Sequence, residues 1–445
     1  MTFNSEALLD RLRSFEQTAT PATRYLVAFS GGMDSTVLLH ALVATRLQHG
    51  TEIVAVHIDH GLQDESGDWE RHCRDLAATL GAGYASERVQ VDSDAGGGTE
   101  AAARNARYAA FRHMVRRGDW LLSAHHQEDQ AETLLLNLLR GSGPAGMAGI
   151  APVQAFAAGH LMRPLLGEAL AALRHYAKRH ELHWLEDPSN RDTAFDRNYL
   201  RREVMPLLAA RWPAAAARFR QSAALATESG QLLDDLADID LRELGGAARL
   251  SVSGLAALSL VRQRNVLRRA VRKCGLPSVP ATRLYQAVRE LIPARDDATP
   301  LVRWPGGEMR RYRDRLYLLP PCDAVAVDDL PMLNREGQRL ELGPGQGELR
   351  LIERPAGGID ATAVAAGLRV RYRKGGEEIR PSGHRHTRKL KKLLQDEGVV
   401  PWMRQRIPLL YADDRIVAVA DLWVADEYAA KQGWGVCWEG GPALF

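Results

Sequence analysis

A short run rich in glycine and serine carries the strongest chemical signal in the chain. It lies between an apolar segment typical of a strand, Arg24–Ser30, and an apolar helical segment, Ser35–Leu47. The run consists of Ser30, Gly31, Gly32, Met33, Asp34 and Ser35. Glycines let the backbone approach an oxyanion, and a helix that begins here offers free N–H groups with the positive end of its dipole. The run therefore predicts a phosphate-binding loop, with an ordinary strand-to-helix turn as the alternative.

Asp34 sets this loop apart from the GxxxxGK phosphate loop, whose lysine is absent here. A carboxylate inside an anion site needs a compensating charge. Asp34 therefore indicates that a metal ion or a substrate proton is also held at the loop.

Two polar clusters follow other predicted strands. His57, Asp59 and His60 end the strand Glu52–Ile58. Ligands of doubly wound sheets bind beyond the carboxyl ends of the strands, so we expect these side chains beside the loop. For His57, a packed position in the core is the alternative.

The second cluster follows the predicted strand Trp120–Ala124, at the start of the predicted helix Gln127–Arg140. It contains His125, His126, Glu128, Asp129 and Glu132. The i, i+3 and i, i+4 spacings place the three acids on one side of the helix start. Acids there also favour the helix dipole, which is the structural alternative to a binding role.

The elements that position these clusters alternate between strand and helix from Arg24 to about Glu186. Further expected elements are helices at 68–80 and 99–117 and a strand near 87–91. This alternation predicts an α/β fold with a doubly wound parallel sheet covered on both faces.

A length of 445 residues predicts several domains. We predict a catalytic domain (1–215), a connecting helix (216–250), a small basic α+β domain (251–322), a linker (323–337) and a C-terminal α+β domain (338–445). The small domain is expected to hold helices at 258–273 and 281–292 and strands within 303–319. The last domain is expected to hold a basic helix, Arg385–Asp396.

Charge is distributed unevenly along the chain. Residues 251–320 hold 14 arginines and lysines against five acids, and residues 369–406 hold 12 against four. Two basic segments in a chain of net charge +3 indicate a polyanionic partner, nucleic acid above all. Solvated helix faces are the alternative.

Several classes of protein are disfavoured by composition. The four cysteines form no CxxC pair, which argues against a disulfide framework, a zinc ribbon and a cysteine-ligated cluster. No apolar stretch approaches the roughly 20 residues of a membrane span, and the first residues show no secretory signal. We expect a soluble, cytoplasmic protein with no membrane partner.

The chain resembles a known family in many ordered blocks. The Ser30–Ser35 run looks like the PP-loop of the N-type ATP pyrophosphatases, and the remaining blocks resemble the bacterial tRNA(Ile)-lysidine synthetases. These blocks are 56–62, 100–108, 124–133, 138–144, 163–166, 184–190, 197–198, 310–317 and 388–394.

The resemblance implies a two-step reaction with ATP and Mg²⁺. The wobble cytidine of a tRNA(Ile) with a CAU anticodon attacks the α-phosphate of ATP, which releases pyrophosphate. The ε-amine of L-lysine then displaces AMP and forms lysidine, so that the tRNA reads AUA instead of AUG. A homodimer is left open.

The resemblance also implies roles for residues. ATP is assigned to Ser30–Ser35, His57, Asp59 and His60, with the metal at Asp34. Catalysis is assigned to Asp34, Arg104 and Asp129. Lysine and the adenylated cytidine are assigned to His125, His126, Glu128, Asp129, Glu132, Arg197 and Asn198. The family usually has aspartate where Glu128 stands, so Asp129 and Glu132 are the stronger candidates for lysine.

Contacts to tRNA are expected from both basic segments. In the first, Arg311, Arg313 and Arg315 follow a strand-like alternation beside Arg310. In the second, Arg388, Lys389, Lys391 and Lys392 spread over little more than one helical turn, which suits binding along a phosphate backbone.

Two other functions share some of these features. A tRNA thiolase also uses a PP-loop, but it needs cysteines in the catalytic domain, where only Cys73 is found. An RNA-binding module with an inactive nucleotide fold is disfavoured by the intact loop and by Asp129.

Overall fold

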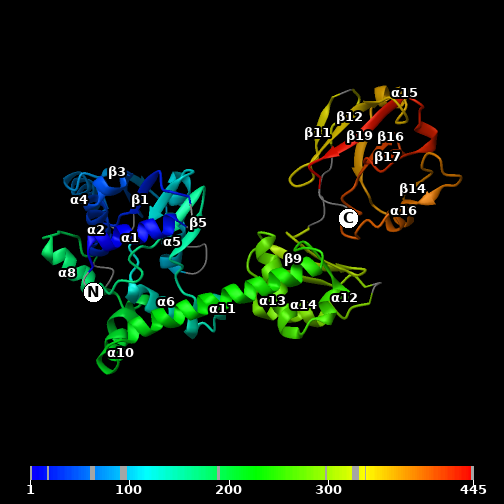
Figure 1. Cartoon of the computed structure of the whole chain (residues 1–445). Helices are drawn as coiled ribbons and strands as arrows, with labels where there is room; N and C mark the ends of the chain where they lie inside the picture. The colour runs from blue at the N-terminus through cyan, green and yellow to red at the C-terminus, as the bar shows by residue number, and fades with distance from the viewer. Residues whose placement is uncertain are drawn as a thin grey trace. The chain divides into compact units, whose positions relative to one another are not determined.

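The computed structural model describes residues 3–17, 20–60, 66–90, 98–187, 191–295, 298–322, 330–335 and 337–441. The chain divides into two compact units, Met1–Leu232 and Leu233–Phe445 (Figure 1). Most of the predicted linker, 323–337, lies outside the described residues. In the described part, no helix combines the length and the apolar character needed to cross a membrane.

The first unit is built on a six-stranded sheet of order β3-β2-β1-β4-β6-β5. Its strands are β1 (Arg24–Ala28), β2 (Glu52–Asp59), β3 (Gly83–Arg88), β4 (Asp119–Leu122), β5 (Val153–Phe156) and β6 (Gly159–Met162). All neighbours are parallel except β5, which pairs antiparallel with β6. The doubly wound sheet is confirmed, and the β5–β6 hairpin is an addition that the sequence did not predict.

Helices cover both faces of this sheet (Figure 1). The helices of this part of the chain are α1 (Ser5–Glu16), α2 (Met33–Ala44), α3 (Arg46–His49), α4 (Ser66–Thr79), α5 (Gly98–Met114), α6 (Gln127–Leu139), α7 (Pro144–Met147), α8 (Leu170–Arg179), α9 (Asp196–Tyr199), the π-helix η2 (Leu200–Val204), α10 (Met205–Arg211) and α11 (Ala215–Glu243), of which α10 and α11 extend away from the sheet. The alternation of strand side chains explains the two cores. Val27 of β1 packs with residues of α1, α2 and α8, while Leu26 packs on the opposite face with Phe111 of α5.

The order of the strands reverses around β1, which lies between β2 and β4. At such a switch point, the connections that leave adjacent strands run to opposite sides of the sheet and leave a crevice at the carboxyl ends of the strands. The loop after β1 and the residues after β4 therefore meet at one edge, as the sequence predicted.

The second unit begins with the C-terminal part of α11 and a four-stranded antiparallel sheet of order β7-β10-β9-β8. Its strands are β7 (Arg249–Ser251), β8 (Leu301–Trp304), β9 (Gly307–Tyr312) and β10 (Arg315–Leu319), and its helices are α12 (Val252–Ala257), α13 (Leu260–Lys273) and α14 (Ala281–Glu290). Their core includes Leu267, Leu284 and Leu316. The predicted helices and strands are present, whereas β7 and α12 were missed.

The C-terminal part of this unit contains short sheets of order β11-β12-β19, β13-β16-β17-β18 and β14-β15. The strands are β11 (Arg339–Glu341), β12 (Glu348–Arg354), β13 (Arg369–Tyr372), β14 (Glu378–Ile379), β15 (Arg388–Lys389), β16 (Pro408–Ala412), β17 (Arg415–Val419), β18 (Trp423–Val424) and β19 (Gly433–Glu439); the helices are α15 (Ala361–Ala366), α16 (Leu390–Asp396) and the short η3 (Asp426–Tyr428). The predicted basic helix Arg385–Asp396 is wrong at its start, because Arg388 and Lys389 pair with β14 and the helix begins at Leu390.

Candidate active site

The glycine-serine loop after β1 is tightly packed. Gly31 has φ +76°, and a Cβ atom at this position would lie 2.8 Å from the Sγ atom of Cys73 and 3.3 Å from Nε1 of Trp69. Both the left-handed backbone and the close neighbours therefore require glycine. The loop is also tied internally, since the Ser35 hydroxyl donates to the Gly32 carbonyl (3.0 Å).

Segments distant in sequence hold this loop in place. The indole N–H of Trp69 on α4 donates to the Ser30 carbonyl (2.8 Å). The backbone N–H of Leu185 donates to the Gly31 carbonyl (2.9 Å). At the start of α2, the N-cap residue Gly32 supplies no side-chain bond to the first N–H groups. These donors remain available to an anion, which a phosphate-binding loop would require.

Asp34 lies on the first turn of α2 with one oxygen unused. Its Oδ1 atom is buried and has no hydrogen-bond partner among the described residues. Burial raises the pKa of Asp34, and the charge of Asp129 adds to the rise. An orphan carboxylate oxygen of this kind fits a hard cation.

Magnesium fits this donor set. Within the described part of the chain, no group of three or more histidine, cysteine or acidic side chains could hold a metal ion. Mg²⁺ is usually bound by one or two carboxylates together with substrate phosphates and water rather than by a protein cage. Asp34 can supply such a carboxylate beside a phosphate-binding loop.

His57, Asp59 and His60 lie at the end of β2, next to β1. The Nδ1 atom of His57 bonds to the Phe29 carbonyl (3.0 Å), and the ring is buried. His57 is therefore packed against the end of β1. Asp59 is buried, with Oδ2 3.4 Å from Nε of Arg88, and burial lowers the pKa of His60.

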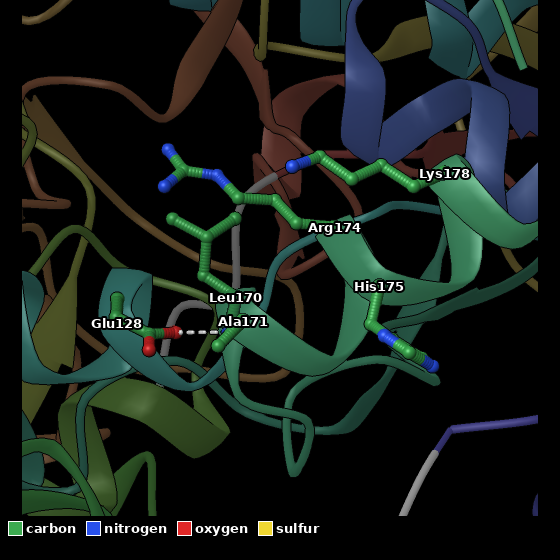
Figure 2. Close-up of a pocket in the computed structure, with 6 residues that line it drawn as sticks. All are labelled: Glu128, Leu170, Ala171, Arg174, His175 and Lys178. Atoms are coloured by element: carbon green, nitrogen blue, oxygen red, sulfur yellow. Dashed lines mark hydrogen bonds between the residues drawn. The ribbon is translucent and has the colours of Figure 1, made fainter.

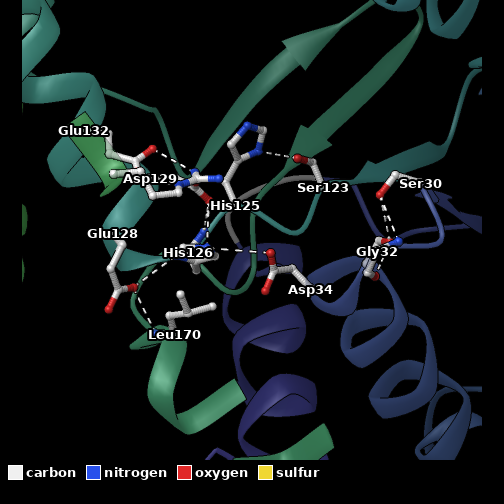
Figure 3. A network of polar contacts seen from close by, with 12 residues as sticks. Ser30, Gly32, Asp34, Ser123, His125, His126, Glu128, Asp129, Glu132 and Leu170 are labelled. Carbon is white, nitrogen blue, oxygen red and sulfur yellow. Dashed lines mark hydrogen bonds and ion pairs between the residues drawn. The ribbon is translucent and has the colours of Figure 1, made fainter. Parts of the chain in front are cut away.

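His126 joins the loop to the acids after β4 (Figure 3). Its Nε2 atom lies 3.7 Å from Asp34 and 3.4 Å from Asp129, and its Nδ1 atom lies 3.0 Å from Glu128. Burial alone would lower the pKa of His126, but the bond to Glu128 and the negative charges around it raise the pKa. Burial lowers the pKa of the neighbouring His125 to about 3, so that ring stays neutral.

Asp129 and Glu132 form an ion-pair cluster with two arginines, called here the carboxylate cluster. Arg197 donates through Nε to Glu132 and through Nη2 to Asp129, both at 2.9 Å. Arg201 donates through Nε to Glu132 (2.7 Å) and through Nη2 to Asp129 (2.8 Å) and Glu132 (2.8 Å). Asp129 also accepts from the His126 backbone N–H (2.9 Å). The structural alternative thus holds for Asp129, which caps α6 and also joins the cluster.

Sequence reasoning found three of the four members of the carboxylate cluster and missed Arg201. Arg197 was expected at the site and is there. Arg201 is one helical turn further on, and this i, i+4 spacing from Arg197 was the available signal. Asn198, which was also expected there, donates to the Asp192 carbonyl (2.9 Å).

Arg104 stands on α5 with an exposed side chain, its guanidinium 5.5 Å from the centre of the Tyr108 ring. Its charge contributes to the low pKa of His125, after the larger effect of burial. Arg104 is therefore within electrostatic range of the residues after β4.

A hollow of about 470 Å³ opens beside Glu128 (Figure 2). Arg174, His175 and Lys178 of α8 line it, and Glu128 accepts from the Leu170 N–H (2.9 Å) at the helix start. No pattern in the sequence had indicated this basic face of α8.

The first basic segment is less available to tRNA than the sequence indicated. Arg311 is buried and donates to the backbone carbonyls of Leu291 and Ile292. Arg313 lies in the turn between β9 and β10 with φ +53°. The predicted alternation of arginines on one strand face is therefore wrong, because a hairpin turn separates Arg311 from Arg315.

Much of the positive charge of this segment is also neutralised inside the unit. Arg262 and Arg269 of α13 pair with acids of α11, among them Asp240 and Asp238. Arg310 pairs with Glu308 (2.6 Å). A count of charges along the sequence therefore overstates the number of cationic side chains that are free to bind phosphate.

The second basic segment keeps exposed cations. Arg388 pairs with Asp396, but Lys389, Lys391 and Lys392 have exposed side chains. Lys391 and Lys392 lie on α16, whose buried face is made by Leu390, Leu393 and Leu394. These lysines are the better candidates for phosphate contacts.

The first unit is thus an α/β domain with uncapped N–H groups after β1 and a carboxylate cluster after the adjacent β4. This class is matched by the PP-loop domain family over residues 5–208. The TilS substrate binding domain matches residues 250–317, and the TilS substrate C-terminal domain matches residues 368–438.

Curated relatives extend the match over nearly the whole chain. The chain is 43% identical to the tRNA(Ile)-lysidine synthase of Alkalilimnicola ehrlichii, with 95% of each chain covered. It is 40% identical to that of Methylococcus capsulatus (94% and 96% covered) and 37% identical to that of Coxiella burnetii (96% and 95% covered). The chain belongs to the tRNA(Ile)-lysidine synthase family. The family, the fold class and the enzyme class predicted from the sequence are confirmed, and the thiolase alternative is set aside.

Proposed function

We propose that the protein forms lysidine at the wobble cytidine of a tRNA(Ile) with a CAU anticodon, using ATP and L-lysine. In the first step, the C2 oxygen of the cytidine attacks the α-phosphorus of ATP, and pyrophosphate leaves. In the second step, the ε-nitrogen of lysine attacks C2, and AMP leaves with that oxygen. The ammonium group loses its proton in the second step.

One observation carries this proposal. His126 bridges the phosphate-binding loop and the carboxylate cluster, at 3.7 Å from Asp34 and 3.4 Å from Asp129. An anion site and a cation site therefore adjoin at the carboxyl ends of β1 and β4. Adenylation needs the first, and recognition of a cationic amino acid needs the second.

The residues divide between the two steps. The N–H groups of the loop bind the phosphates of ATP, and Asp34 would hold Mg²⁺, which offsets the charge of the phosphates when bound. Asp129 and Glu132 bind ammonium groups of lysine. Arg104 contacts the phosphate or the adduct, and His125 supplies a neutral ring beside the adenylated base.

The exposed lysines of the second unit contact the tRNA backbone. Lys389, Lys391 and Lys392 supply positive charge without a base-reading geometry. This role predicts that tRNA affinity falls steeply with salt.

The test is release of pyrophosphate and AMP from a CAU-anticodon tRNA(Ile) transcript as lysine is titrated. We expect pyrophosphate to form with ATP and tRNA, and AMP to be released only when lysine is added. A tRNA(Met) transcript with the same anticodon is the control for substrate choice. Release of AMP that ignores lysine, or that requires a sulfur donor, would refute the proposal.

A further inference from the structure

Arg201 binds both acids of the carboxylate cluster, the position expected for a substrate cation. Three of its hydrogen bonds, at 2.7–2.8 Å, reach Asp129 and Glu132. Arg197 donates to the same two carboxylates. Both oxygens of Glu132, whose side chain is only 1% exposed, are therefore occupied by guanidinium groups.

The charges of the cluster balance before any substrate arrives. Two carboxylates face two guanidinium groups in a largely buried position. Adding an ammonium group of lysine would leave a buried excess of positive charge, which is unfavourable without a new partner. Lysine therefore fits best if one arginine leaves, because the exchange of one cation for another keeps the balance.

Arg201 is the arginine better placed to leave. Its side chain is 38% exposed, against 21% for Arg197. It lies on the π-helix η2 (Leu200–Val204), between the short α9 and α10. Single π-helical turns are rare within α-helices and are often found at functional sites.

A destination for Arg201 lies within electrostatic range. The Nη2 atom of Arg201 donates to Asp129 (2.8 Å), and the His126 ring lies between Asp129 (3.4 Å) and Asp34 (3.7 Å) on the first turn of α2. Asp34 follows the phosphate-binding loop directly. Phosphate groups bound there would offer the guanidinium group an acceptor of its own, whereas it shares both carboxylates with Arg197.

We propose that Arg201 competes with lysine for Asp129 and Glu132 and is drawn away when phosphate groups occupy the adjoining loop. Arg201 is then a positioning residue that makes lysine binding depend on the nucleotide. This inference rests on the proposed function, because it requires lysine to bind at the carboxylate cluster.

The experiment is a calorimetric titration of L-lysine into the full chain, with and without α,β-methylene ATP. For the unmodified protein, we expect the analogue to tighten lysine binding by about fivefold or more, the low end of typical coupling between sites. Lysine should tighten binding of the analogue by the same factor, since coupling is reciprocal.

The variant Arg201→Gln should bind lysine about tenfold more tightly than the unmodified protein when no nucleotide is present, equivalent to about 1.4 kcal/mol. The analogue should add little to that affinity. Arg202→Gln is the matched control, since Arg202 is an exposed arginine on the same π-helix, and it should behave like the unmodified protein.

Arg201→Lys covers the case in which loss of the charge unfolds the protein, which thermal unfolding would reveal. This variant keeps a positive charge on a side chain of different length. Its affinity for lysine should depend on the nucleotide to an intermediate extent. Unchanged lysine affinity of Arg201→Gln without nucleotide, or retention of the full nucleotide effect, would overturn the role of Arg201. Absence of lysine binding and of lysine-dependent AMP release in the unmodified protein would instead overturn the proposed function.

Discussion

Replacing Glu132 by glutamine tests the carboxylate cluster most directly. The change keeps the size of a side chain that is 1% exposed and removes its charge. Arg197 and Arg201 would then share the single carboxylate of Asp129. We expect two separate effects, one on stability and one on the lysine-dependent step.

The effect on stability follows from the lost charge. Breaking a buried ion pair typically costs about 3–5 kcal/mol, because the remaining charge is uncompensated. The cost should be lower here, about 2–3 kcal/mol, because the glutamine oxygen still accepts a hydrogen bond and the partly exposed Arg201 can turn toward water. For a unit of this size, that corresponds to a fall of roughly 5–10 °C in the midpoint of thermal unfolding.

The effect on chemistry should be confined to the second step. Among the described residues, the hydrogen bonds of the Glu132 side chain go to Arg197 and Arg201 and none goes to the phosphate-binding loop, so ATP binding and adenylation should persist. Discharge of the adenylate by lysine should slow by about tenfold or more, equivalent to at least about 1.4 kcal/mol, because one of the two carboxylates for the substrate cation is lost.

A single-turnover assay separates these steps. The adenylated tRNA is followed first, and its discharge is then measured as lysine is titrated. Glu203→Gln, which removes an exposed acid on η2, is the matched control and should leave both steps unaltered. Unchanged lysine dependence in Glu132→Gln would remove Glu132 from the lysine site, and loss of adenylation would assign it to the ATP side.

Other substitutions test the remaining parts of the site. Gly31→Ala should destabilise the fold by about 2–4 kcal/mol, because the backbone at this position is left-handed and the new Cβ atom would meet Cys73. It should also weaken ATP binding in a titration. A stability equal to that of the unmodified protein would contradict the packing argument. Asp34→Ala should keep the fold, as judged by thermal unfolding, and abolish ATP–pyrophosphate exchange in the presence of tRNA. Near-normal exchange would contradict this role of Asp34. The raised pKa of His126 means that its protonated ring stabilises the fold fully below about pH 6.5, and this contribution is lost as pH rises through the raised pKa. His126→Asn should therefore flatten this part of the curve of stability against pH. A curve identical to that of the unmodified protein would show that the ring is not the cause. Lys391→Ala should weaken tRNA binding and reduce its salt slope by about one, measured by filter binding across salt concentrations; an unaltered slope would exclude a phosphate contact.

The phosphate-binding loop could be predicted because it is a contiguous signal. Gly31, Asp34 and Ser35 are fixed by a local sequence that must turn from a strand into a helix. The same holds for the acids after β4, since Asp129 and Glu132 are one turn apart on α6. Alternation of strands and helices then places both signals at one edge of a parallel sheet.

Charge and local secondary structure were less predictable. Arg311 belongs to a basic run, but its guanidinium group satisfies carbonyls at the end of α14. The segment before Leu390 has a helical charge pattern, yet Arg388 and Lys389 form a strand because β14 supplies backbone partners. In both cases, partners distant in sequence outweighed the local pattern.

The sequence alone determined the family, the doubly wound sheet, the anion-binding loop and the acids expected to bind lysine. Each of these depends on neighbouring residues or on the order of elements along the chain. Only the tertiary structure decided how the acids are balanced: Arg197 and Arg201 reach Asp129 and Glu132 across 65 to 72 residues of sequence. The physical reason is that a buried carboxylate must find a cation wherever the fold provides one, and no local pattern specifies which distant arginine that will be.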